Sequence, residues 1–356
     1  MHCAKWVTPG VAIAKIGDVD VAFVGGRWAW EVTELSRDPS VLDGDGRWVV
    51  VLPYSGPATF IRFRHWSAAP PPGALVGTWE GPSIEHWRTS LAQGDYEAAV
   101  AQARRAIAAG TVYQVNVCRV LDADVPVENN IVGLHALLAR GNAAPYSSCI
   151  RVKDAGLEIA SASPELFLRR DGRALRTSPI KGTGRTAADL QPKDEAENVM
   201  IVDLMRNDLN RVCEPGTVRV PELLRQEEHP GLVHLVSDVV GQLRPDVTWG
   251  DVIAATFPPG SVTGAPKSSA LRLIDVVEPT SRGVYCGAIG WVDGTRHQAA
   301  LAVAIRTFWR EGDVLRFGTG AGITWGSDPH REWQETELKA RRLISLAAGV
   351  WQGERS

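Results

Sequence analysis

The chain has 356 residues, of which 44% are hydrophobic and 22% are charged, and its formal net charge is −3. These values are ordinary for a folded globular protein and exclude a disordered or fibrous chain. No basic run suggests a nucleic-acid partner, and no apolar stretch reaches the roughly 18 residues of a membrane span. Met1–Val24 lacks the layout of a secretory signal, and the five cysteines are widely spaced, so we expect a cytoplasmic protein.

The first 85 residues predict a short β-rich region that belongs to the same globule as a catalytic core over residues 86–356. Segments rich in β-branched and aromatic residues predict strands at Val11–Ile13, Val21–Val24, Trp48–Val51 and Phe60–Phe63. Turns are expected at Gly25–Gly26 and at Asp43–Gly46, and a connection rich in proline and glycine follows over Ala68–Pro82.

The rest of the chain mixes strands and helices without strict alternation. Helices are predicted at Tyr96–Ala109, Leu134–Ala139, Lys193–Val212 and His330–Ala348. Strands are predicted at Thr111–Val117, Ile150–Val152, Leu157–Ala160, Leu166–Arg169, Ala288–Val292, Ala299–Arg306 and Val314–Phe317. The third helix has a predicted apolar face at Val199, Val202, Met205, Leu209 and Val212. This pattern indicates an α+β fold with large, mostly antiparallel sheets.

Two pairs of carboxylates have helical spacing, Asp194 with Glu197 and Glu332 with Glu335. Residues three apart lie on one helix face. Two such faces brought together would form an oxygen-rich site suited to Mg²⁺, a hard cation that keeps several waters. The alternative is that both pairs are solvated acidic helix starts, which the helix dipole favours without any metal.

Lys181 lies within Ser178–Arg185, after an apolar residue and before a glycine-rich turn. Glycine allows close backbone approach and can present N–H groups to an anion. A lysine kept neutral by partial burial can act as a nucleophile. The alternative is an ordinary lysine on a surface loop.

A third group of candidates lies toward the C-terminus. Arg306 could hold a carboxylate through two hydrogen bonds, near Tyr285, while Gly320 and Gly322 could expose backbone donors. The alternative is a tight turn beside a surface arginine. His234 lies in an apolar run, where a histidine is more often a core residue than a catalyst.

Some expected motifs fail on inspection. Gly260–Ser268 looks like a phosphate-binding loop, but Ala265 and Pro266 separate the glycine from Lys267, whereas a Walker A loop needs them adjacent. The sequence has no Gly-x-Ser-x-Gly turn, no His-x-x-x-His pair and no Gly-x-Cys-x-Gly turn of a glutaminase.

Taken in order, a series of segments resembles the chorismate-utilising enzymes, which include anthranilate, aminodeoxychorismate and isochorismate synthases. The segments are Ser163–Phe167, Pro179–Thr183, Ala196–Leu209, Val233–Ser237, Gly260–Lys267, Arg282–Gly287, Ile305–Thr307, Gly320–Gly322 and Glu332–Thr336. The resemblance extends from about His86 to the C-terminus. It implies one large α+β domain in which two antiparallel β-sheets pack together with helices outside.

The resemblance also implies roles for individual residues. Lys181 would attack C2 of chorismate and expel the C4 hydroxyl, Glu165 would be the general acid, and His234 would lie near the C4 oxygen. Mg²⁺ would be bound directly by Glu197 and Glu335, and through water by Asp194 and Glu332. The carboxylates of the substrate would be held by Gly182, Thr183, Ser261, Tyr285, Arg306, Gly320 and Gly322.

Two positions distinguish branches of the family. Anthranilate and isochorismate synthases usually have alanine where Lys181 stands, and isochorismate-type members have lysine where Gln114 stands. The combination found here resembles the aminodeoxychorismate synthases, which aminate C4 on the route to p-aminobenzoate and folate. A separate glutamine amidotransferase subunit would then supply ammonia. Anthranilate synthase component I is the alternative, and a nucleotide-binding switch or an inactive scaffold would be rivals of other classes.

The N-terminal region departs from the family pattern. The Leu-Leu-Glu-Ser segment that lines a tryptophan pocket in relatives is missing, and Glu31–Ser36 is at best a remnant of it. Feedback inhibition by tryptophan is therefore not expected. Pro259 also stands where a small residue or glycine is usual.

Overall fold

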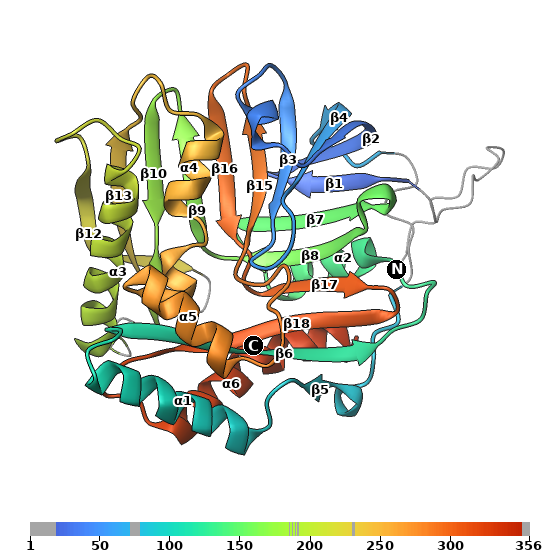
Figure 1. Ribbon diagram of the computed structural model, residues 1–356. Helices are drawn as coiled ribbons and strands as arrows, with labels where there is room; N and C mark the ends of the chain where they lie inside the picture. The colour runs from blue at the N-terminus through green and yellow to red at the C-terminus, as the bar shows by residue number, and fades with distance from the viewer. Residues whose placement is uncertain are drawn as a thin grey trace.

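The computed structural model describes residues 19–71, 79–184, 192–229 and 232–350, together with the single positions 186, 188 and 190. The strand expected at Val11–Ile13 lies outside the described residues. The chain folds into a large sheet with helices on its outside (Figure 1).

The described strands form one antiparallel ladder of 18 strands. Neighbours follow in the order β12 (Arg219–His229), β13 (Leu232–Gln242), β10 (Ala174–Ser178), β9 (Leu166–Asp171), β16 (Gln298–Val303), β15 (Ala288–Asp293), β3 (Arg47–Leu52), β4 (Thr59–Ser67), β2 (Arg27–Ser36), β1 (Val21–Val24), β7 (Tyr146–Val152), β8 (Leu157–Ser163), β17 (Thr307–Glu311), β18 (Val314–Ile323) and β6 (Gln114–Asp124). Short strands β11 (Ile180–Gly184), β14 (Gly264–Ala265) and β5 (Arg88–Thr89) lie beside β13, β6 and β6 respectively.

The predicted α+β class is confirmed, and the ladder has two differently directed halves. In Figure 1, β9, β10, β12, β13, β15 and β16 stand upright with alternating directions, whereas β6, β7, β8, β17 and β18 lie across the page. The two sheets expected from the sequence are thus parts of one hydrogen-bonded ladder, joined through β3, β4, β2 and β1. Because β1 pairs with β7 and β3 pairs with β15, the N-terminal strands share this ladder. The boundary at residue 85 stays a prediction.

The helices cover the outer faces of both halves. They are α1 (Gln93–Ala108), α2 (Ile131–Gly141), α3 (Pro192–Asn210), α4 (Trp249–Thr256), α5 (Lys267–Val277) and α6 (Pro329–Ala347), with 3-10 turns η1 (Pro39–Leu42), η2 (Ile84–His86), η3 (Lys153–Ala155) and η5 (Gly260–Val262). In Figure 1, α1 and α6 lie below the transverse strands, and α3 and α4 lie along the upright strands. The two acidic helices, α3 and α6, therefore belong to different halves of the ladder.

The buried face of α3 differs from the one predicted. Val202, Met205 and Leu209 are buried as expected, but the Val199 side chain is 45% exposed. Asn198, one position earlier, is fully buried and takes the inward place instead. One residue turns a helix by about 100°, so an inward Asn198 directs Val199 away from the sheet.

Several strands extend beyond the predicted bounds or were not predicted. β2 follows β1 through a two-residue hairpin at Gly25–Gly26, where both φ angles are positive, 58° and 72°. Glycine favours this turn because both central residues need positive φ. Strand β6 begins at Gln114, later than the predicted start at Thr111. Strand β18 continues through Ile323, so Gly320 and Gly322 lie in a strand rather than in a tight turn.

Apolar packing holds β6 and β18, where the candidate site lies, from the outside. Val100 of α1 and Ile274 of α5 are buried in one cluster with Val115 of β6 and Ile323 of β18. Each such side chain contributes roughly 1.5–3 kcal/mol through burial. This packing holds the two strands in place, and the polar side chains of the candidate site project from their other face.

Candidate active site

The N-terminal halves of α3 and α6 carry the predicted carboxylates, and charges on the two helices influence each other. Burial raises the pKa of the Glu197 carboxyl. The charges of Lys181 and Lys193 oppose that shift, whereas Asp194 and Glu335 reinforce it. The charge of Glu335, in one half of the ladder, therefore raises the pKa of Glu197 in the other half. The spacing argument correctly placed each pair near the start of a helix.

The two carboxylates of α6 differ from each other. Glu332 is 5% exposed, and burial together with the Glu335 charge raises its pKa. Glu335 forms an ion pair with Lys339, with 2.7 Å between Nζ and Oε1. Burial by itself would raise the pKa of Glu335, but Lys339 and two further lysines bring it below its ordinary value. Lys193 and Lys339 are site residues that the sequence reasoning missed.

The donor set is compatible with a divalent cation. In the described ranges, no three His, Cys, Asp or Glu side chains are gathered closely enough to form a metal cage. Mg²⁺ does not need such a cage, because it usually takes one or two carboxylates and retains several waters. Glu197 is half-buried, and a cation would offset both the burial and the charges of Asp194 and Glu335 that raise its pKa. Glu197 and Glu335 are thus chemically suited to share a Mg²⁺ ion.

Lys181, Glu165 and Ser261 meet at the centre of the site. The Nζ of Lys181, on β11, donates a hydrogen bond to the main-chain carbonyl of Ser261 over 3.2 Å. Glu165, between β8 and β9, is 5% exposed. Burial raises its pKa to about 7, and the Ser261 hydroxyl and the Lys181 charge only partly oppose this shift. A carboxyl that is partly protonated near neutral pH can deliver a proton to a leaving group.

Gly182 explains how β11 approaches the acidic helix so closely. Its φ is +83°, and a Cβ added there would lie 2.8 Å from the Cβ of Asp194. Only glycine combines that φ with that proximity without strain. Thr183 pairs through its backbone with His234 of β13, and the His234 side chain is buried.

Gln114 and Gly322 lie beside the carboxylates. Gln114 Nε2 is 3.5 Å from Glu197 Oε2, and a Cβ at Gly322 would lie only 2.5 Å from that Nε2. Gln114 Oε1 is buried and has no hydrogen-bond partner within the described residues. A Cβ at Gly320 would lie 2.6 Å from Cys118 Sγ. Both glycines therefore provide space within a strand, which excludes the alternative of a tight turn and leaves their substrate-binding role a prediction.

Arg306 provides a positive charge that is poised for an anion. Its φ is +52°, its side chain is half-buried, and its guanidinium forms no ion pair within the described residues. Burial and the neighbouring Arg342 lower its pKa. The Arg306 guanidinium, which lies near the positive charge of Arg342, is therefore a favourable place for a carboxylate ligand.

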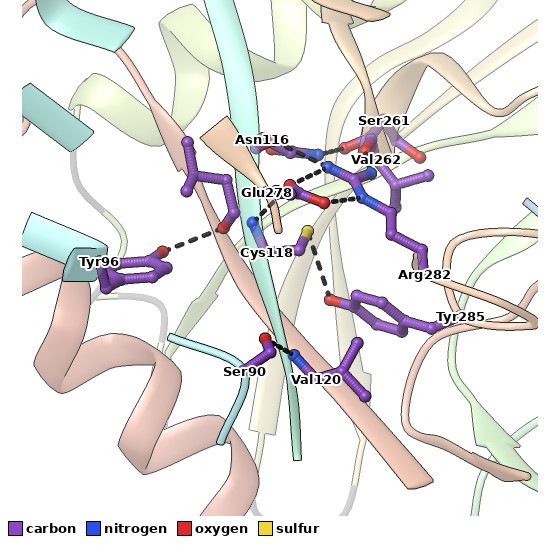
Figure 2. A network of polar contacts seen from close by, with 11 residues as sticks. Ser90, Tyr96, Asn116, Cys118, Val120, Ser261, Val262, Glu278, Arg282 and Tyr285 are labelled. Atoms are coloured by element: carbon purple, nitrogen blue, oxygen red, sulfur yellow. Dashed lines mark hydrogen bonds and ion pairs between the residues drawn. The ribbon is translucent and has the colours of Figure 1, made fainter. Parts of the chain in front are cut away.

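Tyr285 lies in a buried network next to this site (Figure 2). The thiol of Cys118 donates to its hydroxyl over 4.0 Å, and its ring occupies the space that a Cβ at Gly318 would need. Burial raises the pKa of Tyr285 far above its usual value. The structure therefore places Tyr285 beneath β18, in contact with β6.

Arg282 is the centre of the same network and was not singled out in the sequence. It is 1% exposed and binds both oxygens of Glu278, at 2.6 and 2.8 Å. It also donates to the carbonyls of Val262 and Asn116. The signal was present, since Arg282 begins one of the recognised segments, but its partners are distant in the sequence.

The segment that looked like a phosphate-binding loop has a structural role. Lys267 Nζ forms a buried ion pair with Asp208, at 2.7 Å, and donates to the Thr256 carbonyl at 2.8 Å. A lysine held in this way is not available to bind a phosphate group. The pair instead joins α5 to α3.

Comparison with known proteins defines the class of this site. The profile of a family described as chorismate binding enzyme matches residues 73–345. The chain belongs to this family, and it is an enzyme that acts on chorismate.

Relatives carry more than one specific name. Aminodeoxychorismate synthase component 1 of Klebsiella aerogenes is 34% identical over 316 residues, which cover 85% of this chain and 68% of the relative. Anthranilate synthase component 1 1 of Haloarcula marismortui is 32% identical over 381 residues, covering 92% of this chain and 77% of the relative. The family is shown, but these similarities do not separate its branches.

Solved structures agree on the fold. Anthranilate synthase component I from Streptococcus pneumoniae superposes with a TM-score of 0.74 at 24% identity, covering 97% of this chain and 95% of the other. The menaquinone-specific isochorismate synthase of Escherichia coli gives a TM-score of 0.75 at 20% identity, covering 95% and 92%. None of the helices in the described residues is long and apolar enough to cross a membrane.

Proposed function

We propose that this enzyme aminates chorismate at C4 to form 4-amino-4-deoxychorismate. The observation that carries the proposal is the position of Lys181, whose amine lies at the Ser261 carbonyl and whose charge is sensed by Glu165. A lysine amine beside a carboxyl with a pKa of about 7 is a pairing of nucleophile and acid.

The reaction divides into two displacements. In the first, the Lys181 nitrogen bonds to C2, the conjugated ring double bonds shift, and the C4–O bond breaks. Glu165 gives its proton to the departing hydroxyl, which leaves as water. In the second, ammonia bonds to C4, the double bonds shift back, and the C2–N bond breaks to return Lys181. Covalent catalysis thereby replaces one difficult step with two easier ones.

The remaining residues bind and orient the substrate. Arg306 is suited to hold a carboxylate, and Gln114, with its unpartnered Oε1, is suited to accept a hydrogen bond from ammonia. Asp194 and Glu332 would contact water ligands of a Mg²⁺ ion held by Glu197 and Glu335. That ion would supply Lewis-acid charge at a carboxylate of the substrate.

Ammonia would come from a separate glutamine amidotransferase subunit. The relatives named component 1 support this, since the name implies a further component. The sequence itself contains no glutaminase nucleophile turn. The product would serve the formation of p-aminobenzoate and folate.

The first experiment is product analysis. Purified protein is incubated with chorismate, Mg²⁺ and ammonium at alkaline pH, and the products are resolved by chromatography and mass spectrometry. We expect aminodeoxychorismate from the wild type, little C4 product from Lys181→Ala, and normal product from the exposed control Lys153→Ala. Omission of Mg²⁺ should abolish turnover.

The alternative is amination at C2, as in an anthranilate synthase. It is supported by the several relatives of that name at 32–40% identity. Formation of anthranilate by the wild type would establish amination at C2. It would also contradict the proposed nucleophilic role of Lys181. Full C4 amination by Lys181→Ala would retain the product but reject the covalent mechanism.

A further inference from the structure

The turn η5 provides the acceptor for Lys181, and donors from β6 and Arg282 fix that turn. Asn116 Nδ2 donates to the carbonyl of Ser261 over 2.7 Å, and Asn116 N donates to that of Thr263 over 2.8 Å. Between them, Arg282 Nη1 donates to the carbonyl of Val262 over 2.8 Å. Three successive carbonyls thus each accept a hydrogen bond from Asn116 or Arg282, as Figure 2 shows for the first and the middle one.

Asn116 is itself held rigidly. It is 8% exposed, and its backbone pairs with Gly322 across β6 and β18. Its carbonyl accepts a hydrogen bond from Arg282 Nη2 over 3.0 Å, and Arg282 is fixed in turn by Glu278. The side-chain amide that reaches Ser261 is therefore nearly buried and projects from a backbone that the sheet and Arg282 hold in place.

We propose that Asn116 is a positioning residue for Lys181, acting through the Ser261 carbonyl. This inference rests on the proposed function of Lys181 as the nucleophile. The Ser261 oxygen accepts hydrogen bonds from both Asn116 and Lys181. Asn116 fixes the direction of that oxygen, and the oxygen fixes one N–H of Lys181.

The consequence for catalysis follows from the geometry of an amine. A neutral amine has two N–H bonds and one lone pair. When one N–H is bound to a fixed carbonyl, rotation about the Cε–Nζ bond is restricted and the lone pair keeps a constant direction. Holding a reactant in the right direction removes entropy cost from the reaction step, and a misplacement of about 1 Å can cost about a hundredfold in rate.

The test removes the side-chain donor and retains the backbone bonds. Asn116→Ala and Asn116→Asp both lack the Nδ2 donor but keep the main-chain contacts to Thr263 and Arg282. The matched control is Asn129→Ala, because Asn129 is similarly buried and donates from its Nδ2 to the Glu80 carbonyl over 2.5 Å. Only the aspartate variant adds a charge. If both variants behave alike, the effect is therefore due to the lost donor and not to the added charge.

Two measurements are made on each variant. Steady-state kinetics should show kcat reduced by roughly tenfold to a hundredfold, with KM for chorismate within about twofold of the wild type. Labelling of lysines by acetic anhydride without substrate, read by mass spectrometry, should show Lys181 reacting at least about threefold faster, since the flexible amine is no longer held. The exposed Lys153 is the internal reference, and Asn129→Ala should change neither quantity.

The outcomes separate this inference from the proposed function. Unchanged labelling of Lys181 would overturn the positioning role, whatever happens to kcat. In an active wild type, a kcat near normal in both Asn116 variants would also overturn it. If the wild type forms no aminated product, labelling alone decides: faster labelling would leave the positioning of Lys181 standing while the proposed function fails.

Discussion

Glu165 illustrates how burial at a single residue prepares a group for chemistry. Its carboxyl is enclosed where β8 ends and β9 begins, and the neighbouring Lys181 charge is too weak an influence to keep its pKa at the ordinary value of 4.5. The folded protein therefore binds this proton more tightly than the unfolded chain does. Burial of a carboxyl carries a cost in stability as well as a benefit in reactivity.

This cost predicts how stability depends on pH. Because the pKa in the folded state is about 7, the wild type should lose unfolding free energy as pH rises from 4.5 through 7. The difference from Glu165→Gln, which does not titrate, should change by about 3 kcal/mol across that window. Urea unfolding of both proteins at pH 5 and pH 8 measures this. If the difference in unfolding free energy between the two proteins is the same at both pH values, the pKa of Glu165 is not raised in the folded state.

Gly322 is a second residue whose identity the site requires, because there is no space for a side chain at this position. A Cβ there would lie 2.5 Å from Gln114 Nε2 and 3.1 Å from Asn116 Oδ1. Gly322→Ala should therefore displace both amides and lower kcat/KM by about tenfold or more. Gly326→Ala, where a Cβ meets nothing within 4 Å, is the matched control and should keep normal kinetics. Equal activity in the two variants would contradict the assigned crowding.

The sequence could predict individual site residues wherever function depends on a short local pattern. The i,i+3 spacing located Asp194, Glu197, Glu332 and Glu335 on two helices, and the glycine after Lys181 indicated close approach. It could not predict that Asn116 reaches Ser261, because these residues are 145 positions apart and meet only when β6 and η5 pack together.

At the scale of elements, the Arg282–Glu278 pair joins α5, β6 and η5. Both side chains are nearly inaccessible, at 1% and 5% exposure, and Glu278 also accepts from the Cys118 N–H at 2.8 Å. A buried ion pair of this kind contributes only modestly to the free energy of unfolding. Removal of one partner, however, leaves an uncompensated buried charge.

This asymmetry predicts the outcome of a double-mutant cycle. Arg282→Met should lower the unfolding free energy by about 3–5 kcal/mol, because Glu278 is left buried without its partner. Arg282→Met with Glu278→Leu should recover part of that loss, since neither variant residue is charged. Chemical denaturation of the two single variants and the double variant measures the coupling. Strictly additive losses would show that the ion pair does not determine how these elements pack.

The elements missed by sequence reasoning have identifiable causes. Strand β12 has register shifts between Arg219 and Glu222 and again between Glu222 and Arg225, so its pattern does not alternate regularly. Helix α5 buries Ala270, Ile274 and Val277 at helical spacing, but it is short and follows directly after Pro266, so its apolar pattern is weak in the sequence. Strand β2 could have been predicted from the alternation of Trp28, Trp30 and Val32.

For the whole molecule, the unbroken ladder has consequences for cooperativity. The N-terminal strands are hydrogen-bonded to β7 on one side and to β15 on the other, so they lie between the two halves that carry the site. Val50 of β3 is completely buried in the largest apolar cluster, together with side chains from α3 and α4. Damage to the N-terminal region should therefore weaken the entire protein.

The corresponding variant is Val50→Ala. This substitution should lower the free energy of unfolding by about 2 kcal/mol. It should also lower amide protection in β9 and β16 as much as in β3, because the continuous ladder has no boundary that confines the loss. Hydrogen exchange followed by mass spectrometry measures this strand by strand. Val127→Ala, at a side chain that is 76% exposed, should have no effect. A loss restricted to β1–β4 would indicate an independent N-terminal unit.

The atom that receives the Lys181 hydrogen bond belongs to the main chain, and this affects how the site can vary. Any amino acid at position 261 presents the same carbonyl, so a natural or laboratory library of side chains would leave this contact untouched. Its importance would be invisible to substitution scanning and would emerge only when the peptide unit itself is altered, for example by replacing an amide with an ester. Substitutions can reach this contact only through the side chains that hold the turn, which are those of Asn116 and Arg282.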